Sequence, residues 1–264
     1  KQAVTVENQG GGMGVPALGV VARAEPDGHT LLLAAFGNMV LQPMLSKKGG
    51  AELVAKLKPV STISTGPHVL VVSAKLPVKN ISELIDYARA NPGKVSFASA
   101  GTGGTAHLGM EMFKALSKTD VLHVPYKGSA GAVNDLISGE VSAMFSSLPS
   151  LQGLADKGLV KVLAATAPSK SNATKSLPLI GTALPGFDYT TWYAMYAPLG
   201  TPKAVVDVIN AALTKALKTP ALVAKIEAAG TELQAGSPEE VQAWTLRDTE
   251  KWSRVIRDAK IAVE

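Results

Sequence analysis

The sequence predicts an α/β protein built from two similar halves, and three observations lead to this fold class. Predicted strands and helices alternate along most of the 264 residues, which is typical of mostly parallel sheets flanked by helices. The strands at 30–35 and 69–72 are almost wholly apolar, as expected where helices cover both faces of a sheet. A strand, a glycine-rich loop and a helix follow one another twice, at 3–24 and at 95–116.

The first half begins with alternating apolar residues that predict a strand, followed by glycines and by a helix with Pro16 in its first turn. Asn80 and Glu83 form a capping box, which predicts the start of a helix that Pro92 and Gly93 end. The elements expected here are strands at 3–7, 30–35, 59–64 and 69–73, and helices at 15–24 and 81–90.

The rest of the chain continues the alternation and ends in helices. Thr201, Thr219 and Ser237 each precede a proline, which predicts three helix starts with an N-cap residue before an N1 proline. Ser237 and Glu240 form a second capping box. The other expected elements are strands at 95–99, 121–124, 141–145, 160–166 and 190–197, and helices at 107–116, 131–138 and 148–157.

Composition excludes several classes of protein. Hydrophobic residues make up 46% and charged residues 18%, which is too apolar for a disordered chain. The apolar runs are only a few residues long, whereas a membrane-spanning helix needs about 20. The net charge of +5 is scattered and aromatic residues are only 5%, so we expect no nucleic-acid partner.

The residue types that usually carry chemistry are sparse. The chain has no cysteine, and its four histidines (His29, His68, His107 and His123) show no metal-like spacing, so we expect no metal and no cofactor. Neither G-x-S-x-G nor a P-loop motif occurs, and we expect no catalytic residues. The chain begins without Met or an apolar signal region, so we expect a processed or truncated chain that has already lost any export signal.

The loop at 101–106 is the sharpest local feature. It matches the G-x-G-x-x-A pattern of dinucleotide-binding loops, but Asp120 precedes the next strand instead of ending it, which argues against a dinucleotide. Free N–H groups at a helix N-terminus favour an anion, and the hydroxyls of Thr102 and Thr105 suit a small carboxylate. A tight turn without a ligand is the alternative. His107 either points at the anion or caps its own loop.

Several short sequence motifs together resemble those of one protein family. They are V-T-V-E-N at 4–8 before a glycine loop, P-D-G-H-T-L-L at 26–32, S-A-G-T-G at 99–103, H-V-P-Y-K-G at 123–128 and A-P at 197–198. Over essentially its whole length the chain resembles the Bug family, also called the TctC family, of periplasmic receptors for tripartite tricarboxylate transporters.

This resemblance implies a two-domain Venus-flytrap fold of the type II-like periplasmic binding proteins, with two crossover strands near 69–73 and 191–197. The first domain is expected at 1–67 and 197–264, and the second at 68–196. The family normally has a further strand, glycine-containing loop and helix before Val4, which this sequence does not contain.

The resemblance also implies a ligand site between the domains, formed mainly by backbone N–H groups and hydroxyls. Members of the family often have an acidic residue after the strand that ends at Phe145, where this chain has Ser146 and Ser147, which suggests a ligand without an amino group. The expected ligand-binding residues are Phe36, Gly37, Asn38, Ala100, Gly101, Thr102, Gly103, Gly104, Thr105, His107, Tyr126, Lys127, Gly128 and Ser147.

The function expected from these features is capture of a small carboxylate in the periplasm for delivery to the membrane subunits of a tripartite tricarboxylate-type transporter, by a monomeric protein. Two alternatives stay open. One is an α/β enzyme that uses the loop at 101–106 for a phosphorylated cofactor. The other is a ligand sensor that signals to a kinase of a two-component system.

Overall fold

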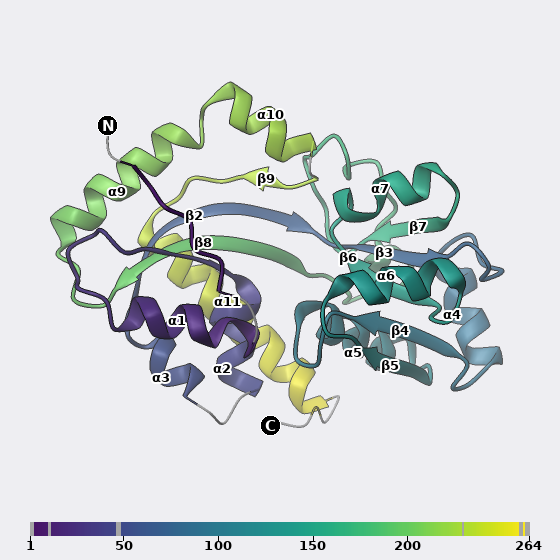
Figure 1. Cartoon of the computed structure of the whole chain (residues 1–264). Helices are drawn as coiled ribbons and strands as arrows, with labels where there is room; N and C mark the ends of the chain where they lie inside the picture. The colour runs from purple at the N-terminus through teal and green to yellow at the C-terminus, as the bar shows by residue number, and fades with distance from the viewer. Residues whose placement is uncertain (1–2, 10–11, 46–48, 229, 259–260, 262–264) are drawn as a thin grey trace.

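A computed structural model describes residues 3–9, 12–45, 49–228, 230–258 and 261 of the chain. Its described strands form two sheets, one of four strands and one of five, and helices pack against both (Figure 1). We call the part around the four-stranded sheet the first lobe and the part around the five-stranded sheet the second lobe. The two lobes lie side by side and are joined by the chain between the two sheets (Figure 1).

The first lobe combines both ends of the described chain. Its sheet has the strand order β1-β8-β2-β9, with β1 at Leu32–Ala35, β2 at Leu57–Pro67, β8 at Thr190–Pro198 and β9 at Glu232–Leu233. Its helical segments are η1 at Gly12–Gly14, α1 at Val15–Ala22, η2 at Gly37–Leu41, α2 at Gln42–Leu45, α3 at Gly50–Val54, α9 at Lys203–Ala216, α10 at Pro220–Ala228 and α11 at Pro238–Asp258.

The second lobe is formed by the central part of the chain. Its sheet has the order β5-β4-β6-β3-β7, with β3 at Val69–Ser73, β4 at Val95–Ser99, β5 at Val121–Pro125, β6 at Ala143–Ser146 and β7 at Val160–Ala165. Its helices are α4 at Ile81–Ala90, α5 at Thr105–Ser117, α6 at Ser129–Ser138, α7 at Pro149–Asp156 and α8 at Ile180–Ala183.

Strand direction differs from the prediction of mostly parallel sheets. In the first lobe the described pairs β1–β8, β2–β8 and β2–β9 are all antiparallel. In the second lobe β4 pairs in parallel with β5 and β6, whereas β3 pairs antiparallel with β6 and β7. The reason is topological: β2 leads the chain out of the first lobe and β8 brings it back, so these two neighbours run in opposite directions.

Most predicted elements are present, and two local predictions are wrong. Residues 3–9 form no strand, and Val4 and Val6 are 89% and 78% exposed, because no described strand pairs with them. Thr201 does not cap a helix, since α9 starts after Pro202 and the buried Thr201 hydroxyl has no hydrogen-bond partner among the described residues. In contrast, α4 and β4 have the predicted bounds, and Ser237 and Glu240 form their capping box.

A chain of aromatic side chains joins the cores of the two lobes through α11. In the first lobe the Phe36 ring packs against Trp192 and Trp252, with centroids 6.0 and 5.8 Å apart. Trp252 lies 5.7 Å from Tyr189, which in turn contacts Phe145 of the second lobe at 5.9 Å. All five side chains are buried. Helix α11 therefore holds the two lobes together by apolar burial.

Removing the buried carboxylate of Asp248 is expected to destabilise this region. Asp248 accepts a 2.7 Å hydrogen bond from Trp192 Nε1 and also pairs with Arg247. Asp248→Ala leaves the buried indole N–H without a partner, which costs about 1–3 kcal/mol. Urea unfolding measures this loss. The control Asp258→Ala removes an exposed carboxylate from the same helix, and an equal loss for both variants would contradict the prediction.

Candidate functional site

A cavity of about 1470 Å³ lies between the two lobes and is lined by residues from both lobes. The first lobe contributes the segment before α1, Asn38, and the ends of β2 and β8. The second lobe contributes the loops that follow β4, β5 and β6. These are loops at the carboxyl ends of strands, where open α/β sheets bind their ligands.

Four described helices start at the cavity wall: α1, α5, α6 and α7. At the cavity lie Gly14, the N-cap residue of α1, and the first residues of the other three helices, Thr105, Ser129 and Pro149. None of these helices has a side-chain cap or an acidic residue in its first turn. Each therefore presents uncapped N–H groups and the positive end of its dipole toward the cavity, which together favour an anion.

The glycine-rich loops bring the backbone close to the cavity. Gly101 and Gly103 have φ values of 146° and 78°, which side chains rarely adopt, and this lets the loop turn tightly before α5. The segment before α1 is also left-handed, including Met13 at φ 51°. Asn38 supports this segment by donating a 2.7 Å hydrogen bond to the Met13 carbonyl. Gly10 and Gly11 of the predicted first loop lie outside the described residues.

Nine of the fourteen predicted ligand-binding residues line this cavity, and the structure brings them together from both lobes. Asn38 comes from the first lobe and the others from the second. The nine are Asn38, Ala100, Gly101, Thr102, Gly104, Thr105, Lys127, Gly128 and Ser147.

The other five predicted residues do not line it. Phe36 is fully buried in the aromatic core. Gly37 lies against Thr105, since a β-carbon there would be 3.4 Å from the threonine hydroxyl. Gly103 packs against Met13 and Leu45 of the first lobe, with a β-carbon position 3.2 Å from each side chain.

His107 and Tyr126 turn away from the cavity toward partners in the protein. His107 caps its own loop, because the Gly103 N–H donates to His107 Nδ1 at 3.0 Å. The Tyr126 hydroxyl donates to Asp135 on α6, and burial together with this hydrogen bond raises the pKa of Tyr126 to about 12. Both side chains therefore hold the shape of the loops, and neither lines the cavity.

The cavity-lining residues on β8 were not predicted from the sequence, nor was His68, which lies between β2 and β3. Thr191 and Tyr193 on β8 face the cavity, while Trp192 and Ala194 between and after them are buried. The sequence from Trp192 onward is apolar or aromatic at every position of the strand, so it gave no signal for which face of β8 meets the cavity. His68 lies between β2 and β3, and its position at the cavity had no local signal.

The described cavity wall carries little charge. Lys127 is the one lysine or arginine among the described lining residues, and no carboxylate is among them. Burial lowers the pKa of His68 to about 4, so this imidazole is neutral at neutral pH, with its Nδ1 3.2 Å from the Tyr189 hydroxyl. The uncapped helix ends and Lys127 are therefore the positive groups available to a ligand.

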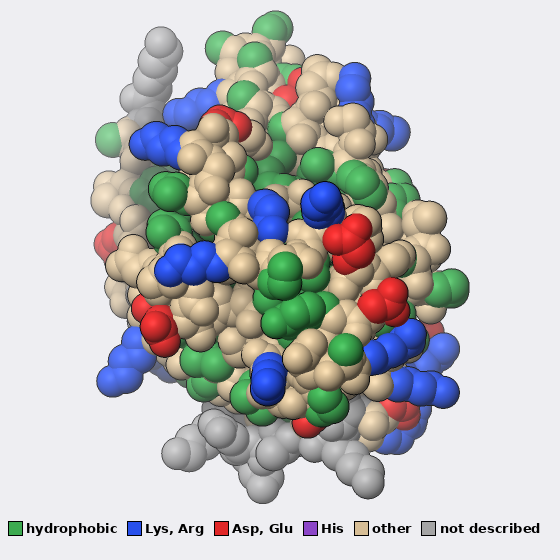
Figure 2. Space-filling view, turned by 90° about the vertical axis from the view of Figure 1, so that its right-hand side faces the viewer, with side chains coloured by type: hydrophobic (Ala, Val, Ile, Leu, Met, Phe, Trp, Pro, Cys, Tyr) green, Lys and Arg blue, Asp and Glu red, His purple; other side chains and the backbone are tan. Residues whose placement is uncertain are grey.

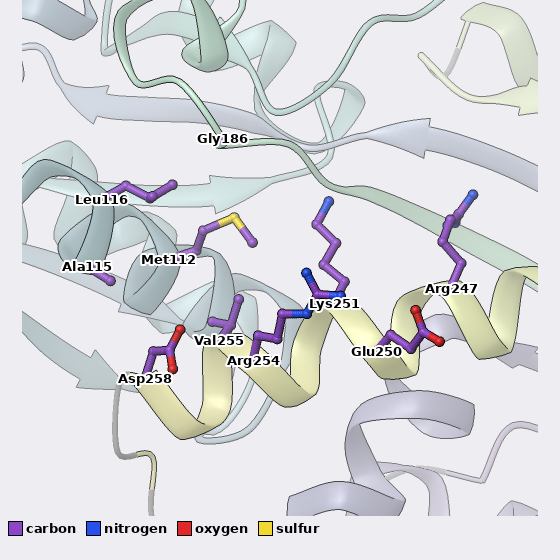
Figure 3. A pocket seen from close by; sticks show the side chains of 10 residues that line it. All are labelled: Met112, Ala115, Leu116, Gly186, Arg247, Glu250, Lys251, Arg254, Val255 and Asp258. Carbon is purple, nitrogen blue, oxygen red and sulfur yellow. The ribbon is translucent and has the colours of Figure 1, made fainter.

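A second cavity of about 390 Å³ lies between α5 and α11, on side chains such as Leu116 and Val255 (Figure 3). Two of its cations are already paired, since Arg247 contacts Asp248 and Lys251 contacts the Asp188 carbonyl and carboxylate. This cavity lacks the converging helix N-termini of the larger one, so the larger cavity is the candidate site.

Three further observations concern metal ions, membrane spans and surface charge in the described part of the chain. No group of three or more His, Asp or Glu side chains in the described residues could hold a metal ion. No described helix is long and apolar enough to cross a membrane. On the end face of the second lobe, Lys and Arg side chains are interspersed with acidic and apolar ones and form no stripe (Figure 2).

Comparison with known proteins identifies the family. The sequence model of the TctC family, described as tripartite tricarboxylate transporter family receptor, matches residues 1–261. The chain belongs to this family of receptors. As a TctC receptor it is a solute-binding protein. The family membership predicted from its sequence motifs is confirmed.

Three solved structures similar to this TctC receptor support the same fold. Rpa4515 from R. palustris, solved with adipate, is 30% identical, with a TM-score of 0.89 over 98% of this chain and 87% of that chain. The periplasmic binding protein BugD is 31% identical, with a TM-score of 0.84 over 97% and 86%. MatC from Rhodopseudomonas palustris, solved with malate, is 27% identical, with a TM-score of 0.81 over 93% and 85%. The predicted Venus-flytrap fold is confirmed.

Proposed function

We propose that this TctC receptor binds a small carboxylate without an amino group in the cavity between its lobes. The observation that carries the proposal is the convergence of four uncapped helix N-termini on a cavity with no described carboxylate. A ligand ammonium group would find no described acidic partner there, and its desolvation would be uncompensated. The adipate and malate in the two R. palustris neighbours are dicarboxylates, which supports this ligand class.

The size of the cavity fits an open receptor. Its volume of about 1470 Å³ exceeds the roughly 300–1,000 Å³ that is usual for sites enclosing a small ligand. A short dicarboxylate therefore contacts both lobes only after they close around it. Closure would be a hinge motion at the strands that join the lobes, and the ligand would favour it by binding the closed state more tightly.

Thermal unfolding of protein that has been unfolded and refolded to remove carried-over ligand tests this function. We expect adipate or malate at ~100 times its Kd to stabilise the protein by about 2.7 kcal/mol, which raises the melting temperature by ~5–10 °C. Glutamate, which adds an ammonium group, and adipamide, which lacks the carboxylates, are expected to shift it little. Equal shifts with adipate and adipamide, or none with any carboxylate tested on folded protein, would refute the proposal.

The remaining features of the function rest on the family. We propose that the receptor acts in the periplasm, delivers its ligand to the membrane subunits of a tripartite tricarboxylate-type transporter, and does so as a monomer without catalysing a reaction. We also propose that its domains divide at 67/68 and 196/197. Unchanged adipate after prolonged incubation with the protein, measured by NMR, supports binding over catalysis.

A further inference from the structure

His68 lies where the chain crosses from the first lobe to the second, between the end of β2 and the start of β3, and it lines the cavity. Its backbone is held by Thr166, the residue that follows β7. The His68 N–H donates to the Thr166 hydroxyl at 2.9 Å, and the Thr166 N–H donates to the His68 carbonyl at 2.9 Å. The imidazole therefore projects from a fixed point at the junction of the two lobes.

Thr166 also holds Tyr189, the residue just before β8, where the chain returns to the first lobe. The Thr166 hydroxyl donates to the Tyr189 carbonyl at 2.8 Å, and the Tyr189 N–H donates to the Thr166 carbonyl at 3.2 Å. Gly109 on α5 makes room for the buried ring, since a β-carbon there would be 2.8 Å from the Tyr189 hydroxyl oxygen. This hydroxyl lies 3.2 Å from His68 Nδ1.

The Tyr189 hydroxyl decides which nitrogen of His68 carries the proton. Burial raises the pKa of Tyr189, so the hydroxyl stays protonated and needs an acceptor. Among the described residues, His68 Nδ1 is the one acceptor within hydrogen-bond distance of it. When Nδ1 of a neutral imidazole accepts a hydrogen bond, the ring proton resides on Nε2. The other tautomer would leave the buried hydroxyl hydrogen without an acceptor, which is costly.

The second ring nitrogen of His68 is a donor that lacks a partner. Nε2 makes no hydrogen bond to a described residue, and it is not among the atoms that are sealed from solvent. No carboxylate is among the described residues that line the cavity, so none of these can accept from it. Because burial lowers the pKa of His68 to about 4, the ring is a neutral donor at neutral pH. An oxygen of the ligand is the acceptor that this arrangement suits.

We propose that His68 is a ligand-binding residue whose Nε2–H donates to a carboxylate oxygen of the ligand, and that Tyr189 is the positioning residue that fixes its tautomer and ring orientation. This inference rests on the proposed function of the cavity. It adds an uncharged donor at the junction of the lobes to the helix N-termini, which belong to one lobe or the other.

The adipate affinity, measured by calorimetric titration at neutral pH, tests both roles. His68→Phe keeps an aromatic ring beside Tyr189 but removes the donor, and we expect it to bind adipate about 10- to 100-fold more weakly. Tyr189→Phe keeps the donor but releases the ring, and we expect a loss of about two- to tenfold. The matched control is Tyr196→Phe, which removes a buried hydroxyl of β8 that does not line the cavity and should keep the wild-type affinity.

A double-mutant cycle separates positioning from packing. In the His68→Phe background, Tyr189→Phe should cause no further loss of affinity, because its effect passes through the imidazole. The double variant also leaves no buried hydroxyl without an acceptor, so it covers the case in which His68→Phe alone folds poorly. An equal loss from Tyr189→Phe in both backgrounds would overturn the positioning role. Wild-type affinity in folded His68→Phe would overturn the ligand contact.

A ligand-free readout separates this inference from the proposed function. In NMR spectra of the imidazole nitrogens of the wild type, we expect the His68 proton on Nε2 and an unprotonated Nδ1. A proton on Nδ1 would overturn the inference even if adipate binds. If the proton is on Nε2 but no carboxylate binds, the positioning by Tyr189 is supported, and the proposed function fails together with the ligand contact.

Discussion

Replacing Ser129 by aspartate is expected to weaken carboxylate binding about 100-fold without destabilising the protein. Ser129 is the first residue of α6, is exposed, and lines the cavity. A carboxylate there meets the positive end of the helix dipole, which stabilises the fold by about 0.3–1 kcal/mol. The same carboxylate repels an anionic ligand about 6 Å away by about 3 kcal/mol at an effective dielectric constant of about 20, or roughly 100-fold in affinity.

Calorimetric titration with adipate and thermal unfolding of the same sample measure the two effects. The matched control is Ser82→Asp, which places a carboxylate in the exposed first turn of α4, a helix that does not line the cavity. The control should keep the affinity of the wild type. If Ser129→Asp binds adipate as tightly as Ser82→Asp does, the ligand does not lie near the start of α6, and the four-helix anion site is wrong.

Phe36→Ala is expected to cause the largest loss of stability among these variants. The Phe36 side chain is 0% exposed and packs against Trp192 and Trp252 where the long helix α11 covers the first sheet. Truncation of a buried phenylalanine leaves a cavity and costs about 3–5 kcal/mol. The midpoint of urea unfolding measures this loss, which is a large fraction of a typical domain's stability.

The milder variant Phe36→Leu separates the core role from the ligand contact that the sequence predicted. Leucine refills most of the space and should cost roughly 1–1.5 kcal/mol. Because Phe36 does not line the cavity, this variant should retain the adipate affinity of the wild type. A tenfold or greater loss of affinity in folded Phe36→Leu would restore Phe36 to the ligand site.

The elements that local sequence signals predicted best are those with their own start and stop residues. Helix α4 begins at the capping box of Asn80 and Glu83 and ends before Pro92, and its bounds were predicted to the residue. These interactions connect residues three or four positions apart, so no other part of the chain is needed to form them. Residues 3–7 alternate as a strand should, yet pair with no described strand, because pairing requires a partner that the local pattern does not specify.

The candidate site was predicted in part. The resemblance placed the loops at 100–105 and 127–128 in the ligand site, and all of their residues except Gly103 line the cavity. It did not separate residues that face the cavity from those that shape it, such as His107 and Tyr126, because one rotation about a side-chain bond decides between the two. Tyr193 was missed because its role depends on which face of β8 meets the second lobe.

The sequence by itself determined the fold class, the absence of disulfides and thiolate sites, and the boundaries of well-capped helices. Its short motifs also determined the family. These properties depend on composition and on neighbours in the chain. Only the tertiary structure decided that the first sheet is antiparallel, that Phe36 belongs to the core, and that His107 and His123 stack on each other. Those properties require contacts between distant segments, such as β2 with β8, and such contacts form only when the whole chain buries its apolar surface together.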